Sequence, residues 1–212
     1  GAMKKSETIL QALEATRVIS IIRGVEPTLV SSVIDSLIRG GIRLLEVTLN
    51  SDSALSLIEE HQTKSDLFVG AGTVLDLGAA KEAVSAGAQF ILAPSLDVDV
   101  ITYCLERDIL VIPGVFSPTE LLLAARSGAQ VMKIFPASSV GPQYIKDLLG
   151  PFGGLKLLPV GGVCLENTPA FMNAGAFAVG IGSYLANPTL AKDHNWAEIT
   201  RRAEAFISAA RR

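Results

Sequence analysis

Short apolar segments alternate with longer amphipathic ones along the whole chain of 212 residues. The amphipathic stretches, such as PTLVSSVIDSLIRGG (27–41) and SPTELLLAARSGA (117–129), place apolar residues three and four apart and carry glycine at or near their ends, as surface helices do. The short segments between them are typical of buried strands. They are VISIIR (18–23), LLEVTL (44–49), LFVGA (67–71), FILAP (90–94), LVIPGV (110–115), VMKIFP (131–136), LKLLPV (155–160) and FAVGIG (177–182).

This order of elements predicts a single (β/α)8 TIM barrel. Apolar strands covered by helices imply a parallel sheet, and eight such units without a linker can close on themselves. We expect one domain over residues 3–212, with an N-terminal helix before the first strand and a C-terminal helix within residues 187–212. Residues 1–2 resemble a tag remnant. The competing open sheet predicts a G-x-G-x-x-G turn after the first strand, which IIRGVEPTLV (21–30) does not supply.

An internal repeat predicts which side chains face the barrel interior. GIRLLEVTL, GAQFILAPS, GAQVMKIFP and GAFAVGIGS align without a gap, and each runs from a helix-ending glycine into an even-numbered strand. Because strand side chains alternate, residues three, five and seven places after each glycine share one face, and alternate strands build one interior layer. The predicted layers are Leu44, Phe90, Val131 and Ala178, then Glu46, Leu92, Lys133 and Gly180, then Thr48, Pro94, Phe135 and Gly182.

Lys133 and Glu46 therefore fall in one interior layer, on opposite sides of the ring. Gly180 adds no side chain to this layer, which leaves room for a small molecule between amine and carboxylate. A structural ion pair is the alternative, but burying two charges costs several kcal/mol per ion. Since active sites of these barrels lie at the C-terminal ends of the strands, we interpret the pair as catalytic.

The pair suggests Schiff-base chemistry. An apolar cavity disfavours the ammonium form of Lys133, so the nucleophilic amine is available near pH 7 to attack a ketone or aldehyde. Glu46 can carry the proton that this chemistry moves. Neither a cofactor nor a metal is required, and the sequence has no histidine-rich cluster.

Two glycine clusters follow the last two strands, where such barrels often bind phosphate. VGGVCLEN (160–167) and GIGSYL (180–185) can bring backbone N–H groups together on an anion, and Ser183 adds a hydroxyl. Gly161, Gly162, Gly182 and Ser183 are the candidate phosphate binders. A plain tight turn is the alternative for either cluster taken alone.

Charge and hydropathy narrow the classes of partner. The net charge of -3 does not suggest the excess of basic residues that nucleic-acid-binding proteins usually have. No apolar run reaches the roughly 18 residues that span a bilayer, and the start of the chain lacks the core of a signal peptide. We expect a cytoplasmic protein with a small-molecule partner, and neither nucleic acid nor membrane.

LEVTLNS (45–51), GAGTVLD (70–76), MKIFPASS (132–139), PVGGV (159–163) and GIGS (180–183) resemble the KHG/KDPG aldolases. These are class I lyases that cleave 2-keto-3-deoxy-6-phospho sugar acids into pyruvate and glyceraldehyde 3-phosphate. The resemblance implies that Lys133 forms the Schiff base and that Glu46 is the general acid and base. It also implies a homotrimer. For the substrate, it implies that Thr73 binds the carboxylate, that Phe135 packs against the pyruvyl group, and that the phosphate is bound by Gly161, Gly162 and Ser183.

Departures from the family pattern bear on the substrate. Asn50 stands where the phosphogluconate enzymes usually carry arginine, and Val160 where they usually carry threonine. Together with SSVGPQYIK (138–146), both features resemble the 2-dehydro-3-deoxy-6-phosphogalactonate branch, whose substrate has the other configuration at C4. We hypothesise that Arg23, at the end of the first strand, binds the carboxylate in place of the missing arginine. Pro94 is expected to line the pocket.

Three alternatives stay open. The enzyme could act on 2-dehydro-3-deoxy-6-phosphogluconate or 4-hydroxy-2-oxoglutarate. It could be a phosphosugar isomerase or epimerase, which would need an acid/base pair but no imine. The chain could also be a non-catalytic phosphosugar-binding barrel. Borohydride trapping separates these classes, because only an imine former gains a covalent adduct.

Overall fold

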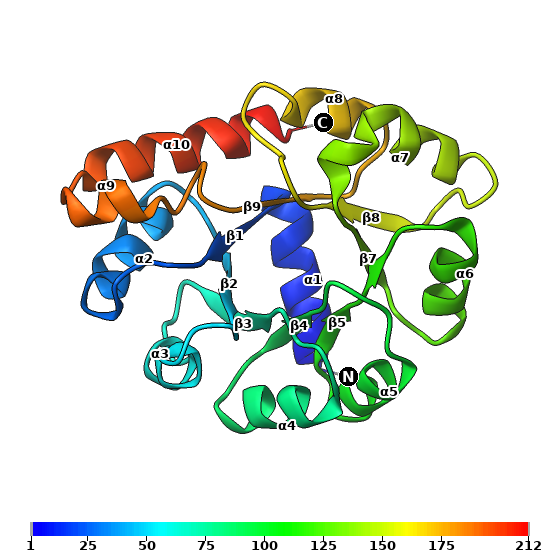
Figure 1. Ribbon diagram of the computed structural model, residues 1–212, viewed down its shortest axis with the longest axis horizontal. Helices are drawn as coiled ribbons and strands as arrows, with labels where there is room; N and C mark the ends of the chain where they lie inside the picture. The colour runs from blue at the N-terminus through cyan, green and yellow to red at the C-terminus, as the bar shows by residue number, and fades with distance from the viewer. Residues whose placement is uncertain (1, 212) are drawn as a thin grey trace.

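The computed structural model describes residues 2–211, so Gly1 of the expected tag remnant and Arg212 at the end of the expected domain lie outside the described residues. Strands and helices alternate (Figure 1). The strands are β1 (Val18–Ile22), β2 (Leu44–Thr48), β3 (Phe68–Gly72), β4 (Phe90–Leu92), β5 (Leu110–Ile112), β6 (Gly114–Val115), β7 (Val131–Ile134), β8 (Lys156–Pro159) and β9 (Val179–Ile181).

Helices precede the first strand and follow most of the others. They are α1 (Lys5–Thr16), α2 (Val30–Arg39), α3 (Ala54–His61), α4 (Leu77–Ser85), α5 (Val98–Glu106), α6 (Pro118–Arg126), α7 (Gly141–Leu149), α8 (Thr168–Asn173), α9 (Pro188–Lys192) and α10 (Trp196–Ala209). Two short 3-10 turns, η1 (Pro27–Leu29) and η2 (Ala137–Ser139), complete the set. The predicted N-terminal helix is confirmed as α1, whereas the segment 187–212, expected to form one C-terminal helix, contains the two helices α9 and α10. None of the described helices is long and apolar enough to cross a membrane.

The strands pair in parallel and form two sheets. One has the order β5-β4-β3-β2-β1-β9 and the other β6-β7-β8. Each predicted strand segment contains an observed strand, and the fifth is divided into β5 and β6 at Pro113, which has no N–H for a ladder. At the other junction, Val160 and Gly180 form an isolated parallel bridge between the segments of β8 and β9. The fold is thus an α/β fold whose largest sheet is a curled six-stranded arc.

Two apolar cores lie on the two sides of the strands. The outer core fills the space between strands and surrounding helices, and includes Val47 and Ile134. The inner core includes the predicted deepest layer, which is confirmed: its members Leu44, Phe90, Val131 and Ala178 are all fully buried there. Ile9 and Leu13 of α1 belong to the same inner cluster.

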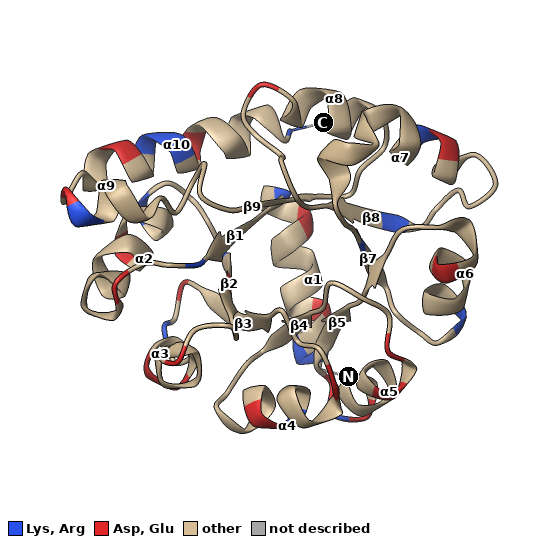
Figure 2. Cartoon of the chain, in the orientation of Figure 1, with Lys and Arg blue, Asp and Glu red and all other residues tan. Residues whose placement is uncertain are grey.

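Helix α1 fills the N-terminal end of the strand arrangement. Asp108, just before β5, accepts hydrogen bonds from the backbone N–H of Lys5 and the hydroxyl of Ser6. Arg17, directly after α1, donates to the carbonyl of Phe177 ahead of β9. In Figure 1, α1 crosses the middle of the view while the other helices lie outside the strands. Figure 2 shows charged positions, coloured blue and red, along these outer helices and loops. The opposite, C-terminal ends of the strands stay open for a site.

Candidate active site

A cavity of about 490 Å³ opens at the C-terminal ends of the strands. Its volume lies in the usual range for small-molecule sites. All but one of the predicted site residues line it: Arg23, Glu46, Asn50, Thr73, Pro94, Lys133, Phe135, Val160, Gly161, Gly162, Gly182 and Ser183. Residues that are far apart in the sequence, at or just after the C-terminal ends of the strands, therefore line one cavity.

Glu46 enters the cavity from β2 and is buried. Its side chain faces inward because Leu45 and Val47, its neighbours on the strand, pack outward against the helices. The Oε1 atom has no hydrogen-bond partner. Burial raises the pKa of the Glu46 carboxyl, and the positive charges of Lys133 and Arg23 oppose this rise. A carboxyl in this position is suited to taking up and returning a proton.

Lys133 enters the same cavity from β7. Burial lowers the pKa of its amine and the positive charge of Arg23 lowers it further, whereas the Glu46 carboxylate works in the opposite direction. The Nζ atom lies 4.8 Å from the centre of the Phe135 ring. Among the described residues, no ion pair joins Lys133 to Glu46. The amine and the carboxyl share a cavity without direct contact, so a substrate can lie between them.

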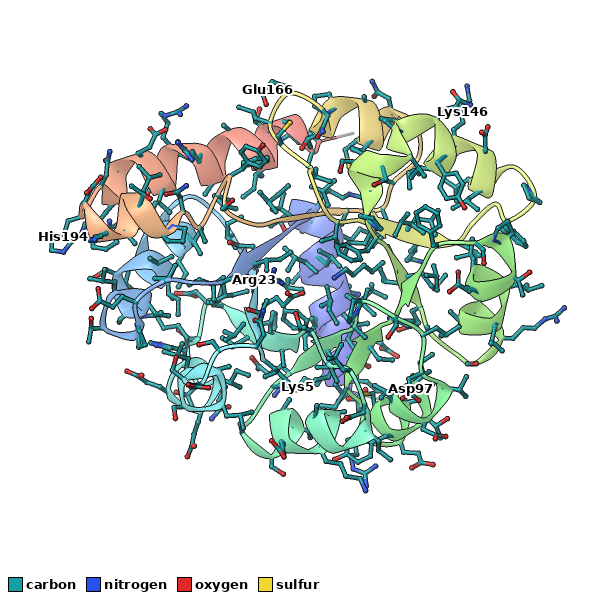
Figure 3. The ribbon with its side chains drawn as sticks, in the orientation of Figure 1. Lys5, Arg23, Asp97, Lys146, Glu166 and His194 are labelled. Atoms are coloured by element: carbon teal, nitrogen blue, oxygen red, sulfur yellow. The ribbon has the colours of Figure 1, made fainter. Side chains whose placement is uncertain are left out.

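Arg23 follows β1 and lines the cavity with its positive charge. Figure 3 shows Arg23 near the middle of the view, whereas Lys146, Glu166 and His194 lie at the periphery. Asn50, two residues after β2, lines the same cavity. The side chain of Arg23 is thus placed where a substrate carboxylate can meet it.

The first glycine loop follows β8. Gly161 and Gly162 have φ of 99° and 71°, a left-handed backbone that favours glycine. The carbonyl of Gly161 accepts from the N–H of Ser138 at 3.0 Å, and that of Gly162 accepts from Nδ2 of Asn167 at 3.0 Å. Asn167 also accepts from the N–H of Cys164 through Oδ1 at 2.8 Å, so one side chain ties the loop together.

The second glycine loop follows β9 and is tied in a similar way. Nδ2 of Asn187 donates to the carbonyl of Ser183 at 3.0 Å, and Oδ1 of Asn187 accepts from the N–H of Leu190 at 2.9 Å. Within the described chain, no acceptor is recorded for the N–H groups of Gly162, Gly182 and Ser183. Carbonyls of the two loops thus accept hydrogen bonds, while these three N–H groups are of the kind that can bind an anion.

Thr73 has a strained backbone. It follows β3 with φ of 56°, and a β-branched residue rarely adopts this left-handed conformation. Strain of this kind concentrates at functional sites. The sequence gives no sign of this backbone, although it places Thr73 at the correct strand end.

The structure departs from the sequence prediction at a few positions. Thr48 is absent from the cavity lining, and its hydroxyl instead donates to the carbonyl of Ile22 at 3.4 Å. Ile21, Val163 and Tyr184 line the cavity without having been predicted as site residues. Tyr184 is 56% exposed and directly follows Ser183, so its place in GIGSYL was the available signal.

The arrangement combines a desolvated amine, a desolvated carboxyl, a guanidinium and two N–H-rich loops in one cavity. The amine can attack a carbonyl carbon, the carboxyl can move protons, and the loops can bind an anion. The described residues contain no group of three or more His, Cys, Asp or Glu that could hold a metal ion.

Comparison with known proteins gives consistent matches. The family model of KDPG and KHG aldolase matches residues 9–202. The 2-dehydro-3-deoxy-phosphogluconate aldolase of Treponema pallidum (strain Nichols) is 35% identical over 167 residues, which cover 78% of this chain and 80% of that protein. The 2-dehydro-3-deoxy-6-phosphogalactonate aldolase of Escherichia coli (strain K12) is 32% identical over 198 residues, covering 91% and 94%.

A solved structure extends the comparison to the chemistry of a relative. The KDPG aldolase of Legionella pneumophila, with pyruvate captured at low pH as a covalent carbinolamine intermediate, has a TM-score of 0.84 and 30% sequence identity. The match covers 93% of this chain and 97% of that one. The curated relatives carry both the gluconate and the galactonate name.

Proposed function

Because the chain belongs to the KDPG and KHG aldolase family and is a carbon-carbon lyase, we propose that it cleaves 2-dehydro-3-deoxy-6-phosphogalactonate into pyruvate and D-glyceraldehyde 3-phosphate. The observation that carries the proposal is the meeting of Lys133 and Glu46 in one buried cavity without a direct ion pair. The galactonate substrate is supported by Asn50 and Val160, which line that cavity at the positions where, by the resemblance, the phosphogluconate enzymes usually carry arginine and threonine.

The substrate lies with its ketone at Lys133. Arg23 binds the carboxylate with paired N–H donors, and Thr73 and Asn50 supply polar contacts beside it. Phe135 and Pro94 form the apolar wall along the pyruvyl group. The phosphate sits at the other end, on the N–H groups of Gly161, Gly162 and Gly182 and the hydroxyl of Ser183.

The reaction begins when neutral Lys133 attacks the C2 carbonyl and water leaves, which gives an iminium. Glu46 removes the proton of the C4 hydroxyl, the C3–C4 bond breaks, and its electron pair moves into the iminium to form an enamine. Glyceraldehyde 3-phosphate leaves. Glu46 then returns a proton to C3, and hydrolysis of the pyruvyl imine releases pyruvate and regenerates the amine.

The finer points of architecture belong to the same proposal. The Val160–Gly180 bridge and the shared strand segment on both sides of Pro113 support closure of the two sheets into one (β/α)8 barrel over a single domain, residues 3–212. The family resemblance supports a homotrimer. We place the enzyme in the cytoplasm with the phosphorylated keto-deoxy acid, pyruvate and glyceraldehyde 3-phosphate as its small-molecule partners.

One experiment tests the substrate directly. Pyruvate release, coupled to lactate dehydrogenase, is measured as kcat/KM for the 6-phosphogalactonate and 6-phosphogluconate keto-deoxy acids side by side. A preference for the galacto epimer supports the proposal. A gluco preference, or equal use of both, favours the second candidate, a 2-dehydro-3-deoxy-6-phosphogluconate or 4-hydroxy-2-oxoglutarate aldolase, which the name of the Treponema relative supports.

Two variants test the assigned roles. Lys133→Ala should abolish both turnover and the borohydride-trapped adduct with pyruvate, because no other described lysine lines the cavity. An isomerase, an epimerase or a non-catalytic binding barrel predicts no trapped adduct even in the wild-type chain. Arg23→Ala should weaken the apparent affinity for pyruvate, and an unchanged affinity would remove Arg23 from the carboxylate site.

A further inference from the structure

Two glycines of β3, Gly70 and Gly72, lie two residues apart and face the inside of the strand arrangement. Gly70 pairs with Glu46 of β2 in the strand register, and Gly72 pairs with Thr48. A Cβ atom built on Gly70 would overlap the ring of Phe90, and one built on Gly72 would overlap Cδ and Oε2 of Glu46. The space over each glycine is therefore occupied by a side chain from a neighbouring strand.

The backbone of Gly72 cannot easily retreat from the Glu46 carboxyl. Its carbonyl accepts from the N–H of Leu49 at 3.0 Å, and β3 is held to β2 through the pairs Val47 with Ala71 and Thr48 with Gly72. Gly72 is not among the residues with a left-handed backbone, so other residues could adopt its conformation. Glycine is needed at this position for space rather than for backbone freedom.

No hydrogen bond fixes the carboxyl of Glu46 in place. Within the described residues, no donor is recorded for either of its oxygens, and Oε1 is buried without a partner. The group lies against the backbone of Gly72, with Lys133 and Arg23 close enough to influence it electrostatically. Packing against Gly72 is thus a contact that limits where the carboxyl can lie.

We propose that Gly72 is a positioning residue for Glu46: its missing side chain lets the carboxyl rest against β3, where it faces the substrate between itself and Lys133. The inference rests on the acid/base role proposed above for Glu46. A methyl group at position 72 displaces the Glu46 carboxyl from the backbone of β3. Lys133 lies on β7, away from this contact, and keeps its position.

The test compares Gly72→Ala with Gly70→Ala. The control lies on the same strand and face and overlaps a side chain in the same way, but it touches Phe90 instead of Glu46. Three quantities are measured: pyruvate release from the phosphorylated acid, the borohydride-trapped imine with pyruvate, and exchange of the pyruvate methyl protons with deuterium, followed by NMR.

Gly72→Ala should lower turnover and proton exchange about 100-fold, because a displacement of about 1 Å can cost that much, while the trapped imine is retained. Gly70→Ala should keep turnover per folded protein and lose thermal stability. If Gly72→Ala exchanges protons and turns over at the same rate as Gly70→Ala, the proposal is overturned.

Further variants separate the possible failures. Where Gly72→Ala does not fold, the double variant Gly72→Ala/Glu46→Ala should fold, because it removes the group that the methyl overlaps. A double variant that also fails to fold contradicts the proposal. Glu46→Gln is measured in parallel: if it exchanges pyruvate protons at the wild-type rate, the acid/base role of Glu46 fails independently of Gly72.

Discussion

Lys133 and Glu46 are each disfavoured as ions by burial, and each is partly restored as an ion by the other. Arg23 acts on both, since its charge disfavours the ammonium of Lys133 and favours the carboxylate of Glu46. The protonation of the Lys133 amine therefore depends on two charged side chains, Glu46 from β2 and Arg23 directly after β1. Removing either neighbour should change the pH at which Lys133 becomes a nucleophile, and the two removals should act in opposite directions.

Glu46→Gln should move the midpoint of imine formation to lower pH, because it removes the charge that raises the pKa of Lys133. Arg23→Ala should move the midpoint to higher pH, because it removes a charge that lowers this pKa. The measurement is the second-order rate constant of borohydride trapping at low pyruvate concentration over a pH series, which reports the free enzyme. Shifts of the same sign in both variants would contradict the assigned electrostatics.

Val160 is the second residue-scale test. It lines the cavity at the position where, by the family resemblance, the gluconate enzymes usually carry threonine, which has nearly the same shape with a hydroxyl in place of one methyl group. Val160→Thr should raise the ratio of kcat/KM for the gluco epimer over the galacto epimer about tenfold, since it restores one hydrogen-bond partner. Val98→Thr, at the exposed start of α5 and outside the cavity lining, is the control and should leave the ratio unchanged. An unchanged ratio in Val160→Thr would remove this residue from the specificity determinants.

At the scale of elements, the two glycine loops share one construction. In each, the asparagine at the start of the following helix donates a hydrogen bond from Nδ2 to a loop carbonyl. Asn167 donates to the carbonyl of Gly162, and Asn187 donates to the carbonyl of Ser183. The same side chains accept an N–H through Oδ1. The conformation of the two loops that form the proposed phosphate site thus depends on the asparagines at the N-termini of α8 and α9.

Asn167→Ala and Asn187→Ala should each raise KM for the phosphorylated acid about three- to tenfold, the effect of one lost neutral hydrogen bond, and leave the trapped imine with pyruvate unchanged. Asn195→Ala is the matched control. Asn195 caps α10 by accepting from the N–H of Glu198 at 3.3 Å, but it holds no loop carbonyl. Its removal should lower stability alone. Equal KM values in all three variants would show that the loops do not depend on these ties.

The direction of side chains was predictable within strands, because the hydrogen-bonded ladder makes successive side chains point to opposite faces of the sheet. Glu46 and Lys133 lie within β2 and β7, and period-two reasoning places both inward, as observed. The reasoning fails for Thr48, the last residue of β2, whose hydroxyl reaches the carbonyl of Ile22. The left-handed backbone of Thr73 and the place of Tyr184 in the cavity lining were not predictable in this way, because both residues lie beyond the ends of their strands.

At the scale of the whole molecule, stability and chemistry lie at opposite ends of the strands. Helix α1 inserts Ile9 and Leu13 into the inner core at the N-terminal end, whereas the cavity opens at the C-terminal end. Among the described residues, none from α1 lines that cavity. Changes in α1 should therefore affect folding more than catalysis.

Leu13→Ala should lower the free energy of unfolding by about 2–5 kcal/mol, since it removes a fully buried side chain from the inner core. The kcat/KM of the folded variant should stay close to the wild-type value. Glu14→Ala, exposed on the same helix, is the control and should change stability by less than about 0.5 kcal/mol. Urea unfolding and pyruvate release measure the two quantities. A large loss of kcat/KM in folded Leu13→Ala would contradict this separation.

Because α1 fills the far end of the strand arrangement, we expect the substrate of the proposed reaction to enter at the C-terminal ends of the strands, where the cavity opens. The keto acid enters with its ketone end first, and its phosphate end stays at the glycine loops of the mouth. In the proposed mechanism pyruvate stays bound to Lys133 after glyceraldehyde 3-phosphate has left by the same mouth, so we expect pyruvate to leave last and to inhibit in competition with the substrate.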